Sequence, residues 1–290
     1  MPNKYLSATV LGILIWSTSF VGTKMAFASF PPLTLGALRF VVASLLLGGI
    51  VLLRRQFVLP AKGDLGLLAL SGFLGITLYF AMENVGVSMT SASNAALIVA
   101  SYPAITILLE RMIYGTRISR LKCFGIAIAI VGVYIISREA GSEGGGDRRL
   151  LGNIILIATG IVWAFYNFAT RKVVNKYSGV TVSFYQTVAG TAFFLPFCLL
   201  ETDQWAKPTA ASLLVLVYLG IFCSVAGFML YNYGLRQLPV ATAITLLNLV
   251  PVFGVLFSVL ILGEEIRADR LAGGVLVIVG VLISVRAASK

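Results

Sequence analysis

The sequence predicts an all-α integral membrane protein of ten transmembrane helices, arranged as two inverted five-helix repeats. Three observations support this fold class: a low charged content, a series of apolar runs of membrane length, and an internal repeat. Of the 290 residues, 59% are hydrophobic and only 11% are charged, and the mean hydropathy is +0.97. Soluble domains carry about a quarter charged residues, so this chain lacks the side chains for a polar surface. The composition excludes a soluble fold, a disordered chain and a disulfide-stapled secreted module.

The apolar runs are long enough to cross a bilayer, whose hydrocarbon core of about 30 Å needs roughly 20 helical residues. Short loops join most of them, and no loop is long enough for a separate soluble domain. The most linker-like segment is glycine-rich, charged and central. We predict spans near 5–26, 33–53, 65–85, 91–112, 121–137, 150–170, 179–200, 211–234, 239–262 and 270–286.

A shift of 147 or 148 residues superposes the two halves of the chain, for example Trp16 on Trp163 and Pro103 on Pro251. Each half holds five spans, an odd number, so the second half must enter the membrane from the opposite side. Inverted repeats of this kind are typical of secondary transporters, and an inverted-repeat channel or scaffold is the alternative. The expected domains are a first repeat at 1–138, a linker at 139–149 and a second repeat at 150–290.

The net charge of +11 indicates orientation in the membrane rather than nucleic-acid binding. Lys and Arg are twice as frequent in the loops on the side of the N-terminus as on the opposite side, and only Asp64 and Glu110 oppose them there. Because cytoplasmic loops are enriched in Lys and Arg, we expect both termini in the cytoplasm.

The sequence offers no sign of a metal, a cofactor or catalytic chemistry. Histidine is absent, and Cys123, Cys198 and Cys223 are scattered through apolar runs, which favours a role as buried apolar side chains. The sequence contains no glycine-rich phosphate-binding loop that would indicate ATP hydrolysis. It also contains no acid pair or nucleophile–base pair that would indicate an enzyme. The expected partners are a small-molecule substrate and membrane lipid, and the oligomeric state is not readable from the sequence.

The paired segments around the two prolines resemble the EamA repeat. They run through Asn84, Gly86, Tyr102, Pro103 and Gly115 in the first half, and through Asn232, Gly234, Pro251, Gly263 and Glu264 in the second. Two such repeats in one chain resemble the bacterial drug/metabolite transporter superfamily, and in particular its aromatic amino acid exporter branch. Arg39 also matches that family's second helix, and its counterpart here is Gln186. The first repeat departs from the pattern at Thr116, where the second has Glu264.

Two tryptophans, Trp16 and Trp163, lie about a dozen residues into their spans, close to the bilayer centre, where an indole needs a hydrogen-bond partner or a wet cavity. Further polar tips in the neighbouring spans favour an amphipathic cavity that stacks an apolar side chain and binds its polar end. The alternative interpretation is interhelical hydrogen bonding and core filling. The predicted substrate-binding residues are Trp16, Tyr79, Asn84, Tyr102, Trp163, Asn167, Tyr231 and Asn248.

Two prolines and two ionisable residues inside spans are further candidates. Pro103 and Pro251 remove backbone hydrogen bonds at equivalent places of the two repeats, which favours a hinge, or a packing kink without ligand contact. A charge in hydrocarbon is costly, so Arg39 and Glu83 should each face a cavity or a partner. For Arg39, carboxylate binding and helix capping remain equally open; Glu83 is a possible partner of Lys24 or an interfacial anchor.

The function expected from the residues and the resemblance together is export by a secondary transporter across the bacterial inner membrane. The substrates are neutral amino acids with aromatic or bulky apolar side chains, and related metabolites, moved by alternating access. With so few buried acids, we expect facilitated diffusion rather than proton coupling. Nucleotide-sugar, drug or polyamine export are the alternatives within transport.

Overall fold

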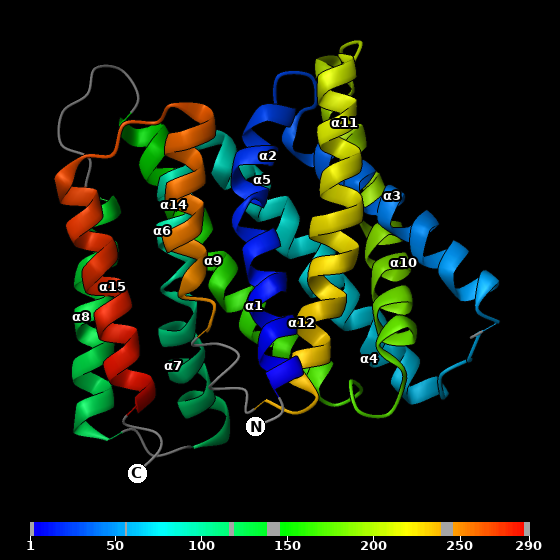
Figure 1. The fold of residues 1–290 in the computed structure, drawn as a ribbon, viewed down its shortest axis with the longest axis horizontal. Helices are drawn as coiled ribbons and strands as arrows, with labels where there is room; N and C mark the ends of the chain where they lie inside the picture. The colour runs from blue at the N-terminus through cyan, green and yellow to red at the C-terminus, as the bar shows by residue number, and fades with distance from the viewer. Residues whose placement is uncertain (1–2, 56, 116–118, 138–145, 239–245, 287–290) are drawn as a thin grey trace.

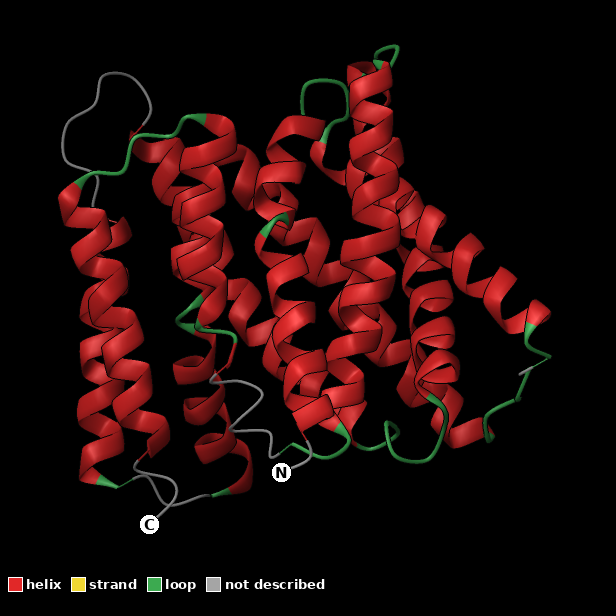
Figure 2. Ribbon diagram, viewed as in Figure 1, coloured by secondary structure: helices red, strands yellow, loops and turns green. Residues whose placement is uncertain are grey.

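The computed structural model describes residues 3–55, 57–115, 119–137, 146–238 and 246–286, and nearly all of these are helical (Figure 2). The first repeat contains α1 (Asn3–Ser17), α2 (Ser19–Ala26), α3 (Pro32–Leu53), α4 (Lys62–Gly72), the π-helix η1 (Phe73–Leu78), α5 (Tyr79–Met89), α6 (Ala92–Val99), α7 (Tyr102–Tyr114) and α8 (Arg120–Ser137). The second contains α9 (Gly146–Arg171), α10 (Gly179–Cys198), the 3-10 helix η2 (Leu199–Gln204), α11 (Ala210–Tyr218), the π-helix η3 (Leu219–Ala226), α12 (Gly227–Leu235), α14 (Leu249–Leu262) and α15 (Ala268–Arg286).

Seven helical segments of the described chain are long and apolar enough to cross a membrane. They are Lys4–Ala26, Pro32–Leu53, Lys62–Met89, Ala92–Tyr114, Asp147–Arg171, Gly179–Gln204 and Ala210–Leu235. The expected spans at 121–137 and 270–286 are helical as α8 and α15, and Leu249–Leu262 is a shorter apolar helix. The all-helical membrane fold is therefore confirmed, and the count of ten is confirmed in part. Residues 239–245 of the expected ninth span lie outside the described residues.

The two halves of the chain run in opposite directions (Figure 1). Both chain ends lie at the lower side of the view, which we call the terminus face, whereas α8 ends and α9 begins at the upper side, the linker face. Helices α8 and α15 lie antiparallel, side by side, at one edge of the molecule. A Cβ on Gly132 would lie 2.6 Å from the carbonyl oxygen of Gly273, so these small residues permit close contact between the helices.

Contacts between the repeats follow an approximate two-fold symmetry. Helix α3 packs against its counterpart α10, α6 against α14 and α8 against α15, while α1 contacts α12 just as its counterpart α9 contacts α5. The backbone repeats this relation in detail. A Cβ on Gly72 would meet the carbonyl oxygen of Gln186, and a Cβ on Gly220 would meet that of Arg39, at 2.3 and 3.1 Å respectively. The pairs of helices that contact each other thus agree with the predicted inverted repeat.

On the linker face, two glutamates of the second repeat hold helix ends of the first. Glu201 follows α10 and accepts hydrogen bonds at the start of α3, and Glu264 follows α14 and accepts them at the start of α6. The donors are the backbone N–H groups of Leu33 (3.0 Å) and Thr34 (2.7 Å) for Glu201, and of Ala92 (2.9 Å) and Ser93 (3.0 Å) for Glu264. Carboxylates are stabilising at helix N-termini, where unpaired N–H groups carry partial positive charge.

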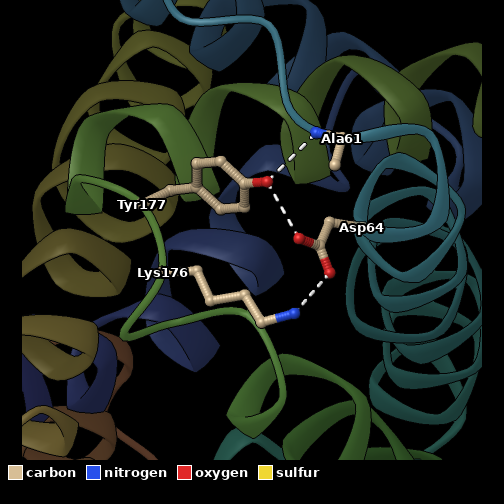
Figure 3. Close-up of polar contacts among 4 residues, drawn as sticks. All are labelled: Ala61, Asp64, Lys176 and Tyr177. Atoms are coloured by element: carbon tan, nitrogen blue, oxygen red, sulfur yellow. Dashed lines mark hydrogen bonds and ion pairs between the residues drawn. The ribbon is translucent and has the colours of Figure 1, made fainter.

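The terminus face is held differently, by an exposed cluster around Asp64 (Figure 3). Its carboxylate accepts hydrogen bonds from Lys176 Nζ at 2.8 Å and from the Tyr177 hydroxyl at 2.9 Å, and the Ala61 N–H donates to that hydroxyl at 3.1 Å. The bond to Asp64 raises the pKa of Lys176 above its ordinary value. The ion pair therefore stays intact through neutral pH and is lost as pH rises through the raised pKa of Lys176 or falls far enough to protonate Asp64.

Candidate functional site

A small cavity of about 50 Å³ lies where the two repeats meet. A cavity needs roughly 10–15 Å³ of such space for each water molecule, so this one holds a few waters. Entry of anything larger requires the repeats to separate. Its lining residues are Trp16, Ser19, Phe20, Arg39, Tyr79, Phe80, Glu83, Val99, Tyr102, Trp163, Phe228, Leu247 and Val250.

Aromatic rings from both repeats form most of the wall. The Trp16 and Trp163 ring centroids are 5.9 Å apart at an interplanar angle of 87°, an edge-to-face contact. The ring centroid of Phe228 lies 5.0 Å from that of Trp16, and the ring centroid of Tyr79 lies 5.3 Å from that of Trp163. Edge-to-face pairs are favoured over face-to-face sandwiches because of the ring quadrupole. The cluster therefore offers both ring edges and ring faces to a bound apolar group.

The two indole N–H groups differ in their partners. Trp16 donates from Nε1 to the carbonyl oxygen of Cys223 at 2.9 Å, which joins α1 to the π-helix η3 of the other repeat. Trp163 is buried, and its Nε1 has no hydrogen-bond partner among the described residues. A buried donor without a partner costs stability, about 1–3 kcal/mol, and such sites need an explanation.

Arg39 is buried on α3, 1% exposed, and reaches the cavity from the first repeat. Its Nε donates to Ser224 Oγ at 2.6 Å and its Nη1 to Ser19 Oγ at 3.2 Å. The guanidinium carbon lies 4.6 Å from the ring centroid of Phe80, a cation–π contact. Within the described parts of the chain, no carboxylate forms an ion pair with it. The chain thus keeps a buried charge whose partners are neutral.

Glu83 faces the same cavity from α5 and is 6% exposed. Its Oε1 accepts a hydrogen bond from the Tyr79 hydroxyl at 2.8 Å. The two residues are four apart, so they share one face of the helix. Tyr102, also on the lining, uses its hydroxyl in a bond with Thr159 of α9. The sequence-based pairing of Glu83 with Lys24 is not among the ion pairs of the described residues.

Four of the eight predicted substrate-binding residues, Trp16, Tyr79, Tyr102 and Trp163, line the cavity, and four do not. Asn84 donates to the Pro32 carbonyl at 2.9 Å, and Asn167 donates to the carbonyl of Trp163 at 2.8 Å within its own helix. Tyr231 lies behind Trp16, with ring centroids 5.0 Å apart, and Asn248 is buried with an unpartnered amide. Asn84 is one residue beyond Glu83, and a step of one turns a helical side chain about 100° away.

The two prolines stand at helix starts rather than inside continuous helices. Helix α6 ends at Val99 and α7 begins at Tyr102, so Pro103 occupies the first turn of a new helix. Pro251 is likewise in the first turn of α14. Proline costs no hydrogen bond there, so neither residue bends an intact helix. The sequence had suggested such a bend. The carbonyl of Leu247, four residues before Pro251, accepts a hydrogen bond from the Val250 N–H at 2.9 Å. The hinge role itself stays a prediction.

Sequence reasoning missed Ser19, Ser224, Phe80 and Phe228, together with the two π-helices. A signal for the phenylalanines was present, since Phe80 falls on Phe228 at a shift of 148 residues. Helices η1 and η3 also occupy equivalent places in the repeats, and π-helical segments are frequent at functional sites. Their location depends on backbone hydrogen bonding that hydropathy does not report.

The family model described as the EamA-like transporter family matches residues 3–138 and 150–286. The chain belongs to this family. A "probable terminal-alkyne amino-acid exporter" from Streptantibioticus cattleyicolor is 30% identical over 97% of this chain and 93% of that protein. An "uncharacterized transporter" from Archaeoglobus fulgidus is 29% identical over 98% of both chains.

Further matches agree with an EamA-like membrane transporter. The "uncharacterized inner membrane transporter YedA" of Escherichia coli is 26% identical over 93% of this chain and 87% of its own. A solved crystal structure covers 96% of both chains with a TM-score of 0.68 and 21% identity, which shows the shared fold. The chain is therefore a multi-pass membrane transporter with a small-molecule substrate, and the earlier resemblance to the drug/metabolite transporters is confirmed.

Proposed function

We propose that this EamA-like transporter exports neutral amino acids with aromatic or bulky apolar side chains by alternating access of its two inverted repeats. The observation that carries the proposal is the aromatic cavity between the repeats, with Trp16 from one and Trp163 from the other. Rings arranged edge to face accept a flat or bulky apolar side chain. The amino-acid exporter of Streptantibioticus cattleyicolor, 30% identical, supports the substrate class.

The charge distribution supports a proposed orientation in the membrane. Lys and Arg are concentrated in the loops of the terminus face, which favours a cytoplasmic location of both termini in a bacterial inner membrane. We further propose facilitated diffusion, driven by the substrate's own gradient. The buried or half-buried acids within the described spans are Asp64, Glu83, Glu110 and Glu201, and of these only Glu83 lines the cavity.

The test is flux in proteoliposomes made with the purified protein. We expect saturable uptake of radiolabelled L-phenylalanine without an imposed pH gradient, and weaker competition by polyamines and nucleotide sugars. Strict dependence on a pH gradient contradicts uniport, and stronger competition by a polyamine or nucleotide sugar contradicts the amino-acid assignment.

Trp163→Ala is the informative variant, because it removes one side of the aromatic wall. Loss of ring contact is expected to reduce phenylalanine flux by at least about tenfold, which corresponds to about 1.4 kcal/mol. The matched control is Trp205→Ala: this third tryptophan is 54% exposed, lies on the linker face and donates to Thr34 rather than lining the cavity. Flux unchanged in Trp163→Ala and reduced in Trp205→Ala would remove the cavity as the substrate site.

A further inference from the structure

We infer that Arg39 and Glu83 form a two-pole site for the zwitterionic head of a free amino acid, with the guanidinium binding its carboxylate and the Glu83 carboxylate binding its ammonium. The inference rests on the proposed function and extends it from the side chain of the substrate to its charged groups. It predicts that the transporter selects amino acids over the corresponding amines and acids.

Both side chains are ionisable and buried, and both line the same cavity. Arg39 is 1% exposed and Glu83 is 6% exposed, and both lie on the cavity lining. Removing a charge from water costs several kcal/mol per ion unless a good partner compensates. In the described structure neither has an ion-pair partner, although the two residues face one space. A ligand carrying both charges supplies each of them with the missing partner.

The existing contacts of Arg39 leave one edge of the guanidinium available. Ser224 and Ser19 take Nε and Nη1, and no hydrogen bond from Nη2 is formed with the described residues. Arg39 itself lines the cavity. A guanidinium with a free edge is suited to a carboxylate, because planar N–H donors match its oxygens.

Glu83 resembles Arg39 in that part of its polar group is bound by the protein and part is not. Its Oε1 is occupied by the Tyr79 hydroxyl, which fixes the carboxylate, and its Oε2 has no hydrogen bond from the described residues. Glu83 itself lines the cavity. An acceptor of this kind is suited to an ammonium, which has only donors to offer.

The rings connect the two poles to the aromatic wall. The Phe80 ring lies 4.6 Å from the guanidinium carbon of Arg39 and 5.0 Å from the Tyr79 ring, whose hydroxyl holds Glu83. Tyr79 in turn lies 5.3 Å from Trp163. The charged head and the apolar side chain of one small molecule therefore have adjacent places in a single cavity, and the opened state only has to widen it.

The counterpart of Arg39 in the second repeat is a neutral side chain. Gln186 occupies the equivalent place on α10 and donates from Nε2 to Ser71 at 2.8 Å and to Thr170 at 2.9 Å. This neutral side chain satisfies the same packing position, next to the glycine of the facing span, without facing the cavity. A positive charge at one of two symmetric positions indicates a role outside packing.

The experiment measures competition against radiolabelled L-phenylalanine uptake in proteoliposomes of the full chain. 2-Phenylethylamine lacks the carboxylate and 3-phenylpropionate lacks the ammonium, and both keep the ring. A charge-assisted hydrogen bond lost from a buried site weakens binding roughly 10- to 100-fold, so each analogue is expected to compete that much less well than unlabelled phenylalanine. This arm uses the unaltered protein, so it does not depend on the folding of any variant.

Two variants then assign the poles. Arg39→Gln is expected to raise the half-saturating concentration of phenylalanine to near that of phenylethylamine while leaving competition by phenylethylamine unchanged. Glu83→Gln is expected to do the same with respect to phenylpropionate. Arg236→Gln and Glu110→Gln remove the same charges from half-buried positions that do not line the cavity, and they should leave the ratios as in the unaltered protein.

The outcomes separate the two proposals. Saturable phenylalanine uptake with equally strong competition by both analogues overturns the two-pole site and leaves the proposed function standing. An equal loss of affinity for phenylalanine and phenylethylamine in Arg39→Gln also overturns it. Absence of phenylalanine uptake by the unaltered, folded protein overturns the proposed function and this inference with it.

Discussion

At the scale of single residues, the two central tryptophans show how the inverted halves have diverged. Trp16 fixes its indole N–H on the carbonyl of Cys223, whereas the N–H of Trp163 has no partner in the described structure. The first arrangement stabilises the contact between repeats. The second leaves a buried donor unpaired, which lowers stability and keeps a hydrogen-bonding group for another partner.

Replacing each tryptophan with phenylalanine separates these roles. Both substitutions remove a similar volume, so the difference between them reports the hydrogen bond. We expect Trp16→Phe to lower the free energy of unfolding by about 1 kcal/mol more than Trp163→Phe does, measured by denaturant titration in detergent micelles. Equal destabilisation, or a larger loss in Trp163→Phe, contradicts the hydrogen-bond assignment.

Of the substrate-site residues predicted from the sequence, some line the cavity and others do not, and their role in binding stays a prediction. Trp16 and Trp163 were predicted because an indole near the centre of a span needs a hydrogen-bond partner or a wet cavity. Asn84 was placed in the cavity because it is polar, but its amide binds the Pro32 carbonyl. Polarity alone does not distinguish a side chain that binds a neighbouring helix from one that faces a ligand. The position of the residue on the helix, relative to Tyr79 and Glu83, does distinguish the two.

At the scale of helices, α8 and α15 form an extensive contact between the repeats. A Cβ on Gly132 would lie 2.6 Å from the Gly273 carbonyl oxygen and 2.7 Å from Val277, both on α15. We expect Gly132→Ala to lower the free energy of unfolding by about 1–3 kcal/mol, as overpacking does. The half-saturating concentration for transport should not change, because neither helix lines the cavity.

Gly49→Ala is the matched control for this helix contact. Gly49 lies within α3, and nothing lies within 4 Å of a Cβ placed there. Alanine is favoured over glycine inside helices by roughly 0.5–1 kcal/mol, so this variant should be as stable as the unaltered protein or more stable. Destabilisation by both substitutions to the same extent would show that the contact is not the cause.

The glutamate that caps α6 is a second test at this scale. Glu264 accepts hydrogen bonds from the N–H groups of Ala92 and Ser93, so Glu264→Gln should cost about 0.5–2 kcal/mol and speed amide hydrogen exchange at the start of α6. Glu265→Gln is the control, since the neighbouring side chain is exposed. Unchanged exchange in Glu264→Gln would contradict the cap.

Hydropathy predicted most spans within a few residues but not the interruptions inside them. The expected span at 91–112 is two helices, because α6 ends at Val99 and α7 begins at Tyr102. Both pieces are apolar, so the break leaves no mark on the average. Pro103 was the available signal. It was interpreted as a kink within one helix, whereas proline in a first turn indicates a new start.

At the scale of the whole molecule, the two membrane faces are joined by bonds of different character. Glu201, on the linker face, is buried against helix N–H groups, whereas in the Lys176–Asp64 pair on the terminus face the lysine side chain is 55% exposed and the aspartate side chain 14%. The screening length falls from about 10 Å at 0.1 M salt to about 3 Å at 1 M. Salt should therefore weaken the terminus face selectively.

Hydrogen exchange measures that selectivity directly. Raising the ionic strength from 0.1 to 1 M is expected to speed exchange at the start of α4, next to Asp64, and to leave the start of α3, next to Glu201, unaffected. Asp64→Asn should abolish the salt response at α4 without altering α3. Equal acceleration on both faces would contradict the proposed difference.

The two repeats differ at Glu264, whose matching position in the first repeat is Thr116. Such differences affect how the transporter behaves in the two directions. Perfect inversion symmetry makes the inward-open and outward-open states mirror one another in free energy, so that the empty carrier divides equally between them. Differences between the repeats, of which Glu264 against Thr116 is one and Arg39 against Gln186 another, remove that degeneracy, and every 1.4 kcal/mol of bias shifts the population tenfold. A uniporter biased in this way cannot accumulate substrate. It can, however, have a low half-saturating concentration on one side of the membrane and a high one on the other, with maximal rates that differ by the same factor.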